Sequence, residues 1–174
     1  MKSKDISSLA NPELKFLLSL RKNKIRKKEE KSLAEGYREN IQLIKSNYAI
    51  DTLYICDDLF MGENNFELVD KFKNKNIRIV KLSKKVFAAL SYRDKSDGII
   101  SLFKTKDLSL IDNPLSGPIF IADKIEKPGN LGTMIRTARS FNIKNVIASD
   151  SVTDIYNPNV IRSSIGHIFN INIY

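Results

Sequence analysis

The first hundred residues alternate between segments with a strand period and segments with a helix period. Residues 77–82 (IRIVKL) switch strictly between apolar and polar side chains, which predicts a half-buried strand. Residues 63–75 repeat an apolar side chain every third position, as one face of a helix does. An earlier helix should begin at Asn11, whose side chain can cap it, with Pro12 in its first turn. The other predicted elements are strands at 32–35, 52–56 and 98–103 and helices at 37–48 and 83–90. This order predicts an α/β sandwich with a largely parallel sheet.

A second series of elements follows residues 104–117, where Asn-Pro and Ser-Gly pairs and few apolar positions indicate a linker. Strands are expected at 118–123, 145–149 and 170–174, with helices at 130–141 and 157–164 between them. Strand and helix in this order are typical of half of a doubly wound sheet. We therefore expect a first domain at 1–103 and a second at 118–174.

The positive charge is concentrated in the first domain. The chain has 29 basic and 20 acidic residues, a net charge of +9. Residues 111–174 hold 6 basic and 5 acidic residues, which leaves 23 and 15, a net +8, for residues 1–110. The segment RKNKIRKKEEK at 21–31 alone has seven Lys or Arg and two Glu. The asymmetry favours a first domain that contacts a polyanion, with a merely solvated charged face as the alternative.

The composition excludes several classes of site. Cys56 is the only cysteine and His167 the only histidine, so no internal disulfide and no Cys- or His-rich metal site is possible. No apolar run reaches the roughly 20 residues of a membrane span, so no membrane partner is expected. Together these features predict a cytoplasmic protein with no metal.

The most informative stretch is PGNLGTMIRTARSFN, which starts at Pro128 and lies between a predicted strand and a predicted helix. Gly129 and Gly132 allow close backbone approach, Asn130 can cap the helix, and Arg136 follows on it. The free N–H groups of such a turn attract phosphate or carboxylate. Neither the Walker pattern nor the three-glycine dinucleotide pattern is present, so a capped helix with surface arginines remains an equal alternative.

Three segments in order resemble one family. The pattern N-x-G-x-x-x-R-x-A after IADKIEKPG resembles the first motif of the TrmH/SpoU branch of the SPOUT methyltransferases. DIYNPNVIRSSIGHIF at 154–169 resembles the segment that follows in that family. KFLLSLRKNKIRKKEEKSLAEGYRENI at 15–41 resembles its substrate-binding domain, with Glu35 and Gly36 as the family's Glu-Gly pair. The resemblance implies a ribosomal-protein-like α/β domain followed by a Rossmann-like SPOUT domain with a trefoil knot.

Members of the family transfer a methyl group from S-adenosylmethionine to a ribose 2′-hydroxyl of RNA. The resemblance implies that Arg136 is the catalytic arginine and that Asn130 helps to shape the site. A guanidinium does not act as a base, so an electrostatic role is expected for Arg136. Its charge would bind a phosphate and stabilise the alkoxide as it forms. Structured RNA is the expected partner, with ribosomal RNA ahead of transfer RNA. The cations expected to contact RNA phosphates are Arg21, Lys22, Lys24, Arg26, Lys27, Lys28, Arg38 and Arg93.

The chain departs from the family in its last part. The family's second and third motifs, which form the knot and wrap the donor, are not found, and no glycine follows Gly166. We therefore expect a C-terminally truncated methyltransferase domain with the knot missing, a donor pocket that is largely absent, and exposed apolar edges at 155–156 and 171–174. The family's homodimer uses knot elements and is not expected to form here through them.

Two other functions stay open at this point. The first is a non-catalytic RNA-binding module made of the first domain. The second is a small nucleotide-binding α/β protein that uses residues 128–132 for phosphate, although it leaves the basic first domain unexplained. Asp123, Asp150 and Asp154 follow strands and are expected to be caps rather than site carboxylates.

Overall fold

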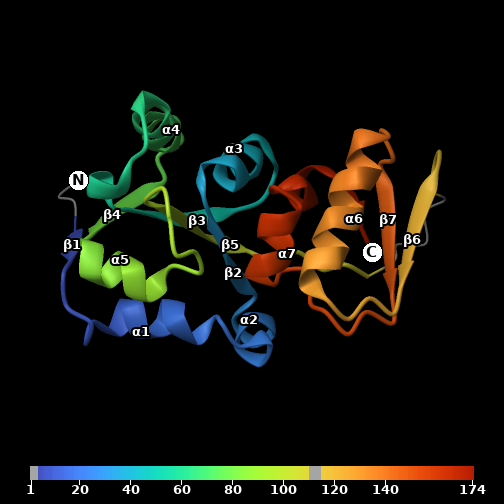
Figure 1. Ribbon diagram of the computed structural model, residues 1–174, viewed down its shortest axis with the longest axis horizontal. Helices are drawn as coiled ribbons and strands as arrows, with labels where there is room; N and C mark the ends of the chain where they lie inside the picture. The colour runs from blue at the N-terminus through green and yellow to red at the C-terminus, as the bar shows by residue number, and fades with distance from the viewer. Residues whose placement is uncertain (1–3, 110–114) are drawn as a thin grey trace.

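The computed structural model describes residues 4–109 and 115–174, which form two sheets side by side with helices packed on them (Figure 1). Lys104, the first residue of the expected linker at 104–117, is the last residue of a strand, and residues 110–114 lie outside the described residues. The first sheet and its helices comprise β1 (Lys4–Ile6), α1 (Pro12–Ser19), α2 (Asn23–Glu29), β2 (Lys31–Glu35), α3 (Tyr37–Lys45), β3 (Ile50–Ile55), η1 (Asp57–Leu59), α4 (Glu63–Asn74), β4 (Arg78–Leu82), α5 (Lys84–Leu90) and β5 (Ile99–Lys104). The second comprises β6 (Ile119–Asp123), α6 (Pro128–Ser140), β7 (Asn145–Ser149), α7 (Pro158–Ser163), η2 (His167–Asn170) and β8 (Asn172–Ile173).

The first sheet is mixed. Its strand order is β1-β4-β3-β5-β2, and β4 is parallel to both β1 and β3. β5 runs antiparallel to β3 and to β2, so β1, β2, β3 and β4 share one direction and β5 alone is reversed, and the expectation of a largely parallel sheet holds except at β5. The hydrophobic pattern shows that a segment is a strand, but it does not show in which direction the strand enters the sheet.

Helices cover both faces of the first sheet (Figure 1). On one face, α1 and α5 contribute Leu14, Leu17 and Phe87 to a core with Tyr54 of β3. On the other face, the core includes residues of α3 and α4, among them Phe72, which is fully buried. The predicted start of α1 is confirmed, because the Asn11 side chain accepts a hydrogen bond from the N–H group of Glu13.

The second sheet is parallel throughout, in the order β6-β7-β8, as the pattern predicted. Its core continues into the first sheet, because Leu43 of α3 and Phe103 of β5 pack in the same cluster as residues of α6 and α7. The expected apolar edges are wrong: Tyr156 is 6% exposed and Ile173 8% exposed. The exposed apolar residues of this sheet are instead Ile119 and Ile121 on β6.

No helix among the described residues is long and apolar enough to cross a membrane.

Candidate functional site

The helix with the Asn-x-Gly motif begins earlier than the sequence predicted. α6 starts at Pro128, with Lys127 as the preceding residue and no side-chain cap. Asn130 is the third helical residue and is exposed, so its predicted capping role is wrong. Proline suits a first helical position because its φ is preset and it has no N–H group to leave unpaired. The Asn130 side chain is therefore available to solvent or to a ligand at the start of the helix.

Gly132 allows α6 and α7 to pack closely. A Cβ atom at this position would lie 2.0 Å from Ser163 Oγ and 2.5 Å from the carbonyl oxygen of Val160. Gly129, one turn earlier, has no neighbour within 4 Å of such an atom. The predicted close approach is thus confirmed at Gly132 and wrong at Gly129. Gly132, a glycine of the family motif, therefore serves here to let α6 and α7 pack against each other.

We expect Gly132→Ala to destabilise the protein and Gly129→Ala to leave it unchanged or slightly more stable. The first substitution places a methyl group against the backbone of α7, and overpacking of this kind costs about 1–3 kcal/mol. The second adds a better helix former in open space. Urea unfolding of both variants measures the difference. Equal stabilities of the two variants would contradict this account of the helix contact.

Arg136 is exposed on α6, and no hydrogen bond joins its side chain to Asn130 among the described residues. The six-residue spacing sets the two side chains about 120° apart around the helix.

His167, at the start of η2, lies near α6. Burial lowers the pKa of its imidazole, and the positive charges of Arg139 and Arg136 lower it further. Its Nδ1 is buried with no hydrogen-bond partner in the described part of the chain.

Several of the predicted RNA-binding cations point into solvent. Four lysines of the basic segment and one arginine of α3 are exposed, namely Lys22, Lys24, Lys27, Lys28 and Arg38. Among them only Lys28 has an ion pair in the described residues, a loose contact of 3.9 Å with Glu29. These side chains are free to meet phosphates.

Arg26 is buried, so the expectation that it contacts an RNA phosphate is wrong. Its side chain is 3% exposed and its Nη2 lies 2.6 Å from Asp154 Oδ2. Its Nη1 donates to the carbonyl oxygens of Leu20 and Arg21 at 2.7 and 2.9 Å. A guanidinium whose donors are already used inside the protein has none to offer to RNA.

Arg21 and Arg93 are engaged in the structure as well. Arg21 donates to three carbonyl oxygens at the end of α5 and lies 5.1 Å from the ring centroid of Tyr92. Arg93 forms a 2.6 Å ion pair with Glu39 of α3. Both arginines hold the segment after α5 in place.

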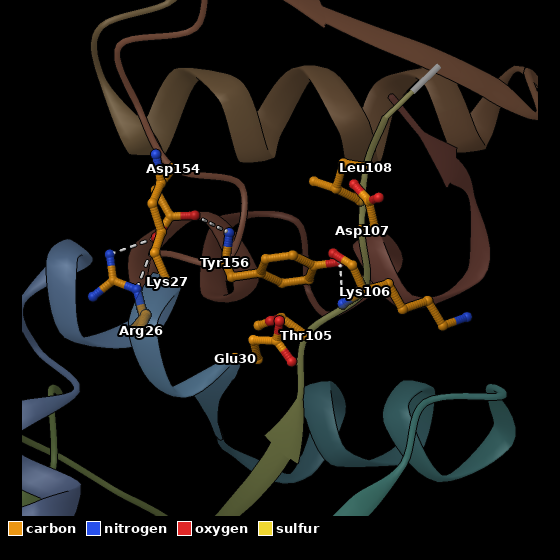
Figure 2. Close-up of a pocket in the computed structure, with 9 residues that line it drawn as sticks. All are labelled: Arg26, Lys27, Glu30, Thr105, Lys106, Asp107, Leu108, Asp154 and Tyr156. Carbon is orange, nitrogen blue, oxygen red and sulfur yellow. Dashed lines mark hydrogen bonds and ion pairs between the residues drawn. The ribbon is translucent and has the colours of Figure 1, made fainter. Parts of the chain in front are cut away.

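A cavity of about 570 Å³ lies between α2, the segment that follows β5 and the segment that precedes α7, and Figure 2 shows its lining. Arg26 and Lys27 form one wall beside Asp154, and the Tyr156 side chain crosses toward Lys106. The Tyr156 hydroxyl contacts the backbone N–H group of Lys106 at 3.1 Å and the Tyr48 hydroxyl at 3.2 Å. Burial raises the pKa of both tyrosines, so their hydroxyls stay protonated. The cavity has three cationic and three acidic residues, so its charge is balanced.

No local sequence pattern indicates that residues 154–156 connect the two sheets. Asp154 was expected to be a cap, and it does accept the N–H group of Tyr156 at 3.0 Å. Its second oxygen holds Arg26, which is 128 residues away in the chain. The Ser32 hydroxyl donates to the carbonyl oxygen of Tyr156 at 2.7 Å. Only the fold brings these partners together.

Asp123, by contrast, is exposed at the end of β6. No group of three or more His, Cys, Asp or Glu suited to a metal occurs within residues 4–109 and 115–174.

Two family models match the chain. The MRM3-like substrate binding domain matches residues 11–101, which is more than half of the chain. The SpoU rRNA Methylase family matches residues 117–174. The chain belongs to the SpoU/TrmH rRNA methyltransferase family. The MRM3-like domain corresponds to the first sheet with its helices, and part of the SpoU domain corresponds to the second, which confirms the resemblance drawn from the motifs.

Similar proteins share this arrangement. The 23S rRNA (guanosine(2553)-2′-O)-methyltransferase RlmP of Bacillus subtilis is 25% identical over 98% of this chain and 64% of its own length. The human mitochondrial rRNA methyltransferase 3 is 29% identical over 85% of this chain and 36% of its own length. An rRNA methyltransferase from Sinorhizobium meliloti superposes with a TM-score of 0.83 at 26% identity, over 99% of this chain and 65% of that structure. The chain thus spans less than two thirds of the length of these relatives.

A structure of the Sinorhizobium meliloti enzyme contains bound S-adenosylmethionine. Here Asp123, Asn130 and Arg136 are all exposed. Exposed side chains alone do not form an enclosing pocket for the donor. We assign no residue to it and derive no step through it.

Proposed function

We propose that this chain binds structured RNA, ribosomal RNA first of all, and presents a ribose 2′-hydroxyl beside Arg136 for methylation by a SpoU-type enzyme using S-adenosylmethionine. The observation that carries the proposal is the link between α2 and the second sheet. The exposed lysines of α2 flank Arg26, and Arg26 is tied to Asp154, which follows β7. RNA held on α2 is therefore held at a fixed position relative to α6.

Arg136 has the properties that an electrostatic role requires. It is exposed, and no ion pair joins it to a carboxylate among the described residues, so its guanidinium donors are available. A guanidinium keeps its charge at all working pH values and can donate two parallel hydrogen bonds to a phosphate. Charge that develops on the 2′-oxygen as it loses its proton is stabilised by a fixed cation nearby. Asn130, also exposed on α6, is the second proposed contact with the ribose region.

A non-catalytic RNA-binding module is the second candidate. It is supported by the exposure of both proposed catalytic residues, Asn130 and Arg136. Both candidates require RNA on the lysines of α2, so RNA binding is the first property to test. Methyl transfer then separates them.

Replacing Lys22, Lys24, Lys27 and Lys28 by alanine should weaken RNA binding and flatten its salt dependence. Each lysine that contacts a phosphate of duplex RNA adds about one unit to the slope of log K against log salt, so the slope should fall by about 3–4 units. Fluorescence anisotropy with a labelled stem-loop of ribosomal RNA at several salt concentrations measures this. The matched control replaces Lys71 and Lys73, exposed on α4 at the other face of the sheet. An unchanged slope in the α2 variant would count against the proposal.

A further inference from the structure

An unusual backbone turn places His167 against the helix that carries Arg136. Ile165 and Gly166 precede it with positive φ angles of 52° and 73°. A β-branched residue rarely adopts this left-handed conformation, and residues held in it are concentrated at functional sites. The turn is closed by hydrogen bonds, because Gly166 donates to the carbonyl oxygen of Ile161 at 2.9 Å and His167 to that of Ser164 at 3.0 Å. The backbone at His167 is therefore fixed before any ligand binds.

The two ring nitrogens of His167 have different surroundings. Nδ1 is buried and has no hydrogen-bond partner among the described residues. Nε2 is not among the buried atoms and makes no hydrogen bond within the described part of the chain. It is therefore the nitrogen that reaches solvent, on a ring that is only partly exposed. Such a ring can donate a hydrogen bond from Nε2 to a ligand at the surface.

Two arginines of α6 act on this ring. Arg136 and Arg139 are three residues apart, so their side chains lie on the same side of the helix. Burial lowers the pKa of the His167 imidazole, the charges of the two arginines lower it further, and no described carboxylate raises it. Neither arginine forms an ion pair with a carboxylate in residues 4–109 and 115–174. The three basic groups thus face one another without an acid between them.

The neighbouring helices supply no compensating acid either. η2 also contacts α3, where a Cβ atom on Gly166 would lie 2.9 Å from Glu39 Cα. The Glu39 carboxylate is turned to Arg93, with which it forms an ion pair of 2.6 Å. The other charged residues of α3 and α7 are exposed cations, namely Arg38, Lys45 and Arg162. Like charges placed together repel one another, so this arrangement favours an anionic ligand.

We propose that Arg139 and His167 bind, together with Arg136, one backbone phosphate of the RNA next to the ribose that is methylated. The inference rests on the proposed function and adds to it the residues that place this phosphate. Each guanidinium can donate paired hydrogen bonds to phosphate oxygens, and Nε2 of the imidazole adds a further donor. A bound anion favours the charged imidazole, so RNA binding should take up a proton and tighten as the pH falls.

The first measurement follows the protonation of His167 by NMR. It is the only histidine, so its Hε1 proton gives one signal. Without RNA, Arg139→Gln should raise the pKa of His167, because a repelling charge is removed. Arg162→Gln is the matched control on α7 and should leave that pKa unchanged. A pKa that does not respond to Arg139→Gln would overturn the proposed cluster.

The second measurement repeats the titration with a bound stem-loop of ribosomal RNA. The salt concentration is about 0.15 M, where charges more than about 8 Å apart are largely screened. The pKa of His167 should then rise. Inorganic phosphate at the same concentration as the RNA should not raise it, because it lacks the contacts of the RNA with α2. An equal rise with inorganic phosphate would overturn the proposal in favour of a site for free phosphate.

The third measurement is the affinity for the same stem-loop at two pH values. It should increase about 5–10-fold from about pH 7.5 to about pH 5.5 in the unsubstituted chain, and not in His167→Gln. An equal increase in both chains would overturn the proposal. So would a His167 signal that stays unmoved while the stem-loop binds through the lysines of α2, which leaves the proposed RNA binding intact. No binding of the stem-loop at all would overturn both.

Discussion

Arg26→Ala should destabilise the protein by about 3–5 kcal/mol, because it leaves the Asp154 carboxylate largely buried without its partner. The Asp154 side chain is only 11% exposed, and Arg26 holds it through Nε at 2.8 Å and Nη2 at 2.6 Å. The substitution also frees two carbonyl oxygens at the end of α1 that Arg26 Nη1 now satisfies. Urea unfolding followed by circular dichroism measures the change in the free energy of unfolding.

Lys24→Ala is the matched control for Arg26→Ala. It removes a cation from the same helix at an exposed position, so the stability should change by no more than about 0.5 kcal/mol. A double-mutant cycle with Asp154→Ala isolates the coupling between the two side chains. The doubly substituted protein should lose much less than the sum of the single losses. Full additivity would mean that the ion pair does not hold the two sheets together.

Arg136→Ala should lower the rate of methyl transfer to RNA by about 10²–10³-fold, which is the loss expected when a fixed charge beside a developing oxyanion is removed. Arg136 is exposed, so stability should stay unchanged. RNA affinity should also stay close to that of the unsubstituted chain, since the proposed binding surface lies on α2. The measurement is the initial rate of labelled methyl incorporation into ribosomal RNA from S-adenosylmethionine.

The control for Arg136→Ala is Arg162→Ala. Arg162 is an exposed arginine of the neighbouring helix α7 that has no proposed role. A wild-type rate in the Arg136 variant, or an equal fall in both variants, would contradict the assigned role. Absence of transfer by the unsubstituted chain, with RNA bound, would instead favour the RNA-binding module.

Much of the fold was accessible from the sequence because most elements carry a local signal. The parallel order of the second sheet followed from its alternation of strands and helices. The three-residue strand β1 was missed because it is too short to show a period and forms only by pairing with β4. The direction of β5 depends on the sheet as a whole, and no local pattern encodes it.

The candidate site was predictable in its residue types and less so in their roles. Both Pro128 and Asn130 are residues that commonly mark the start of a helix, and in the structure α6 begins at Pro128. Arg26 looks like its neighbours in a basic run, but helix geometry turns it inward, where its partner is 128 residues away. Tyr92 and Arg93 donate hydrogen bonds to Glu35 and Glu39, which only the folded chain brings into reach.

The central claim is that one RNA contacts both α2 and α6. Ultraviolet crosslinking of the chain to ribosomal RNA, with the crosslinked peptides identified by mass spectrometry, tests it most directly. The account predicts crosslinks in peptides from residues 21–31 and from residues 128–140, and their loss when Lys22, Lys24, Lys27 and Lys28 are replaced. Crosslinks that avoid both helices, or that persist at residues 128–140 after the lysines are removed, would contradict it.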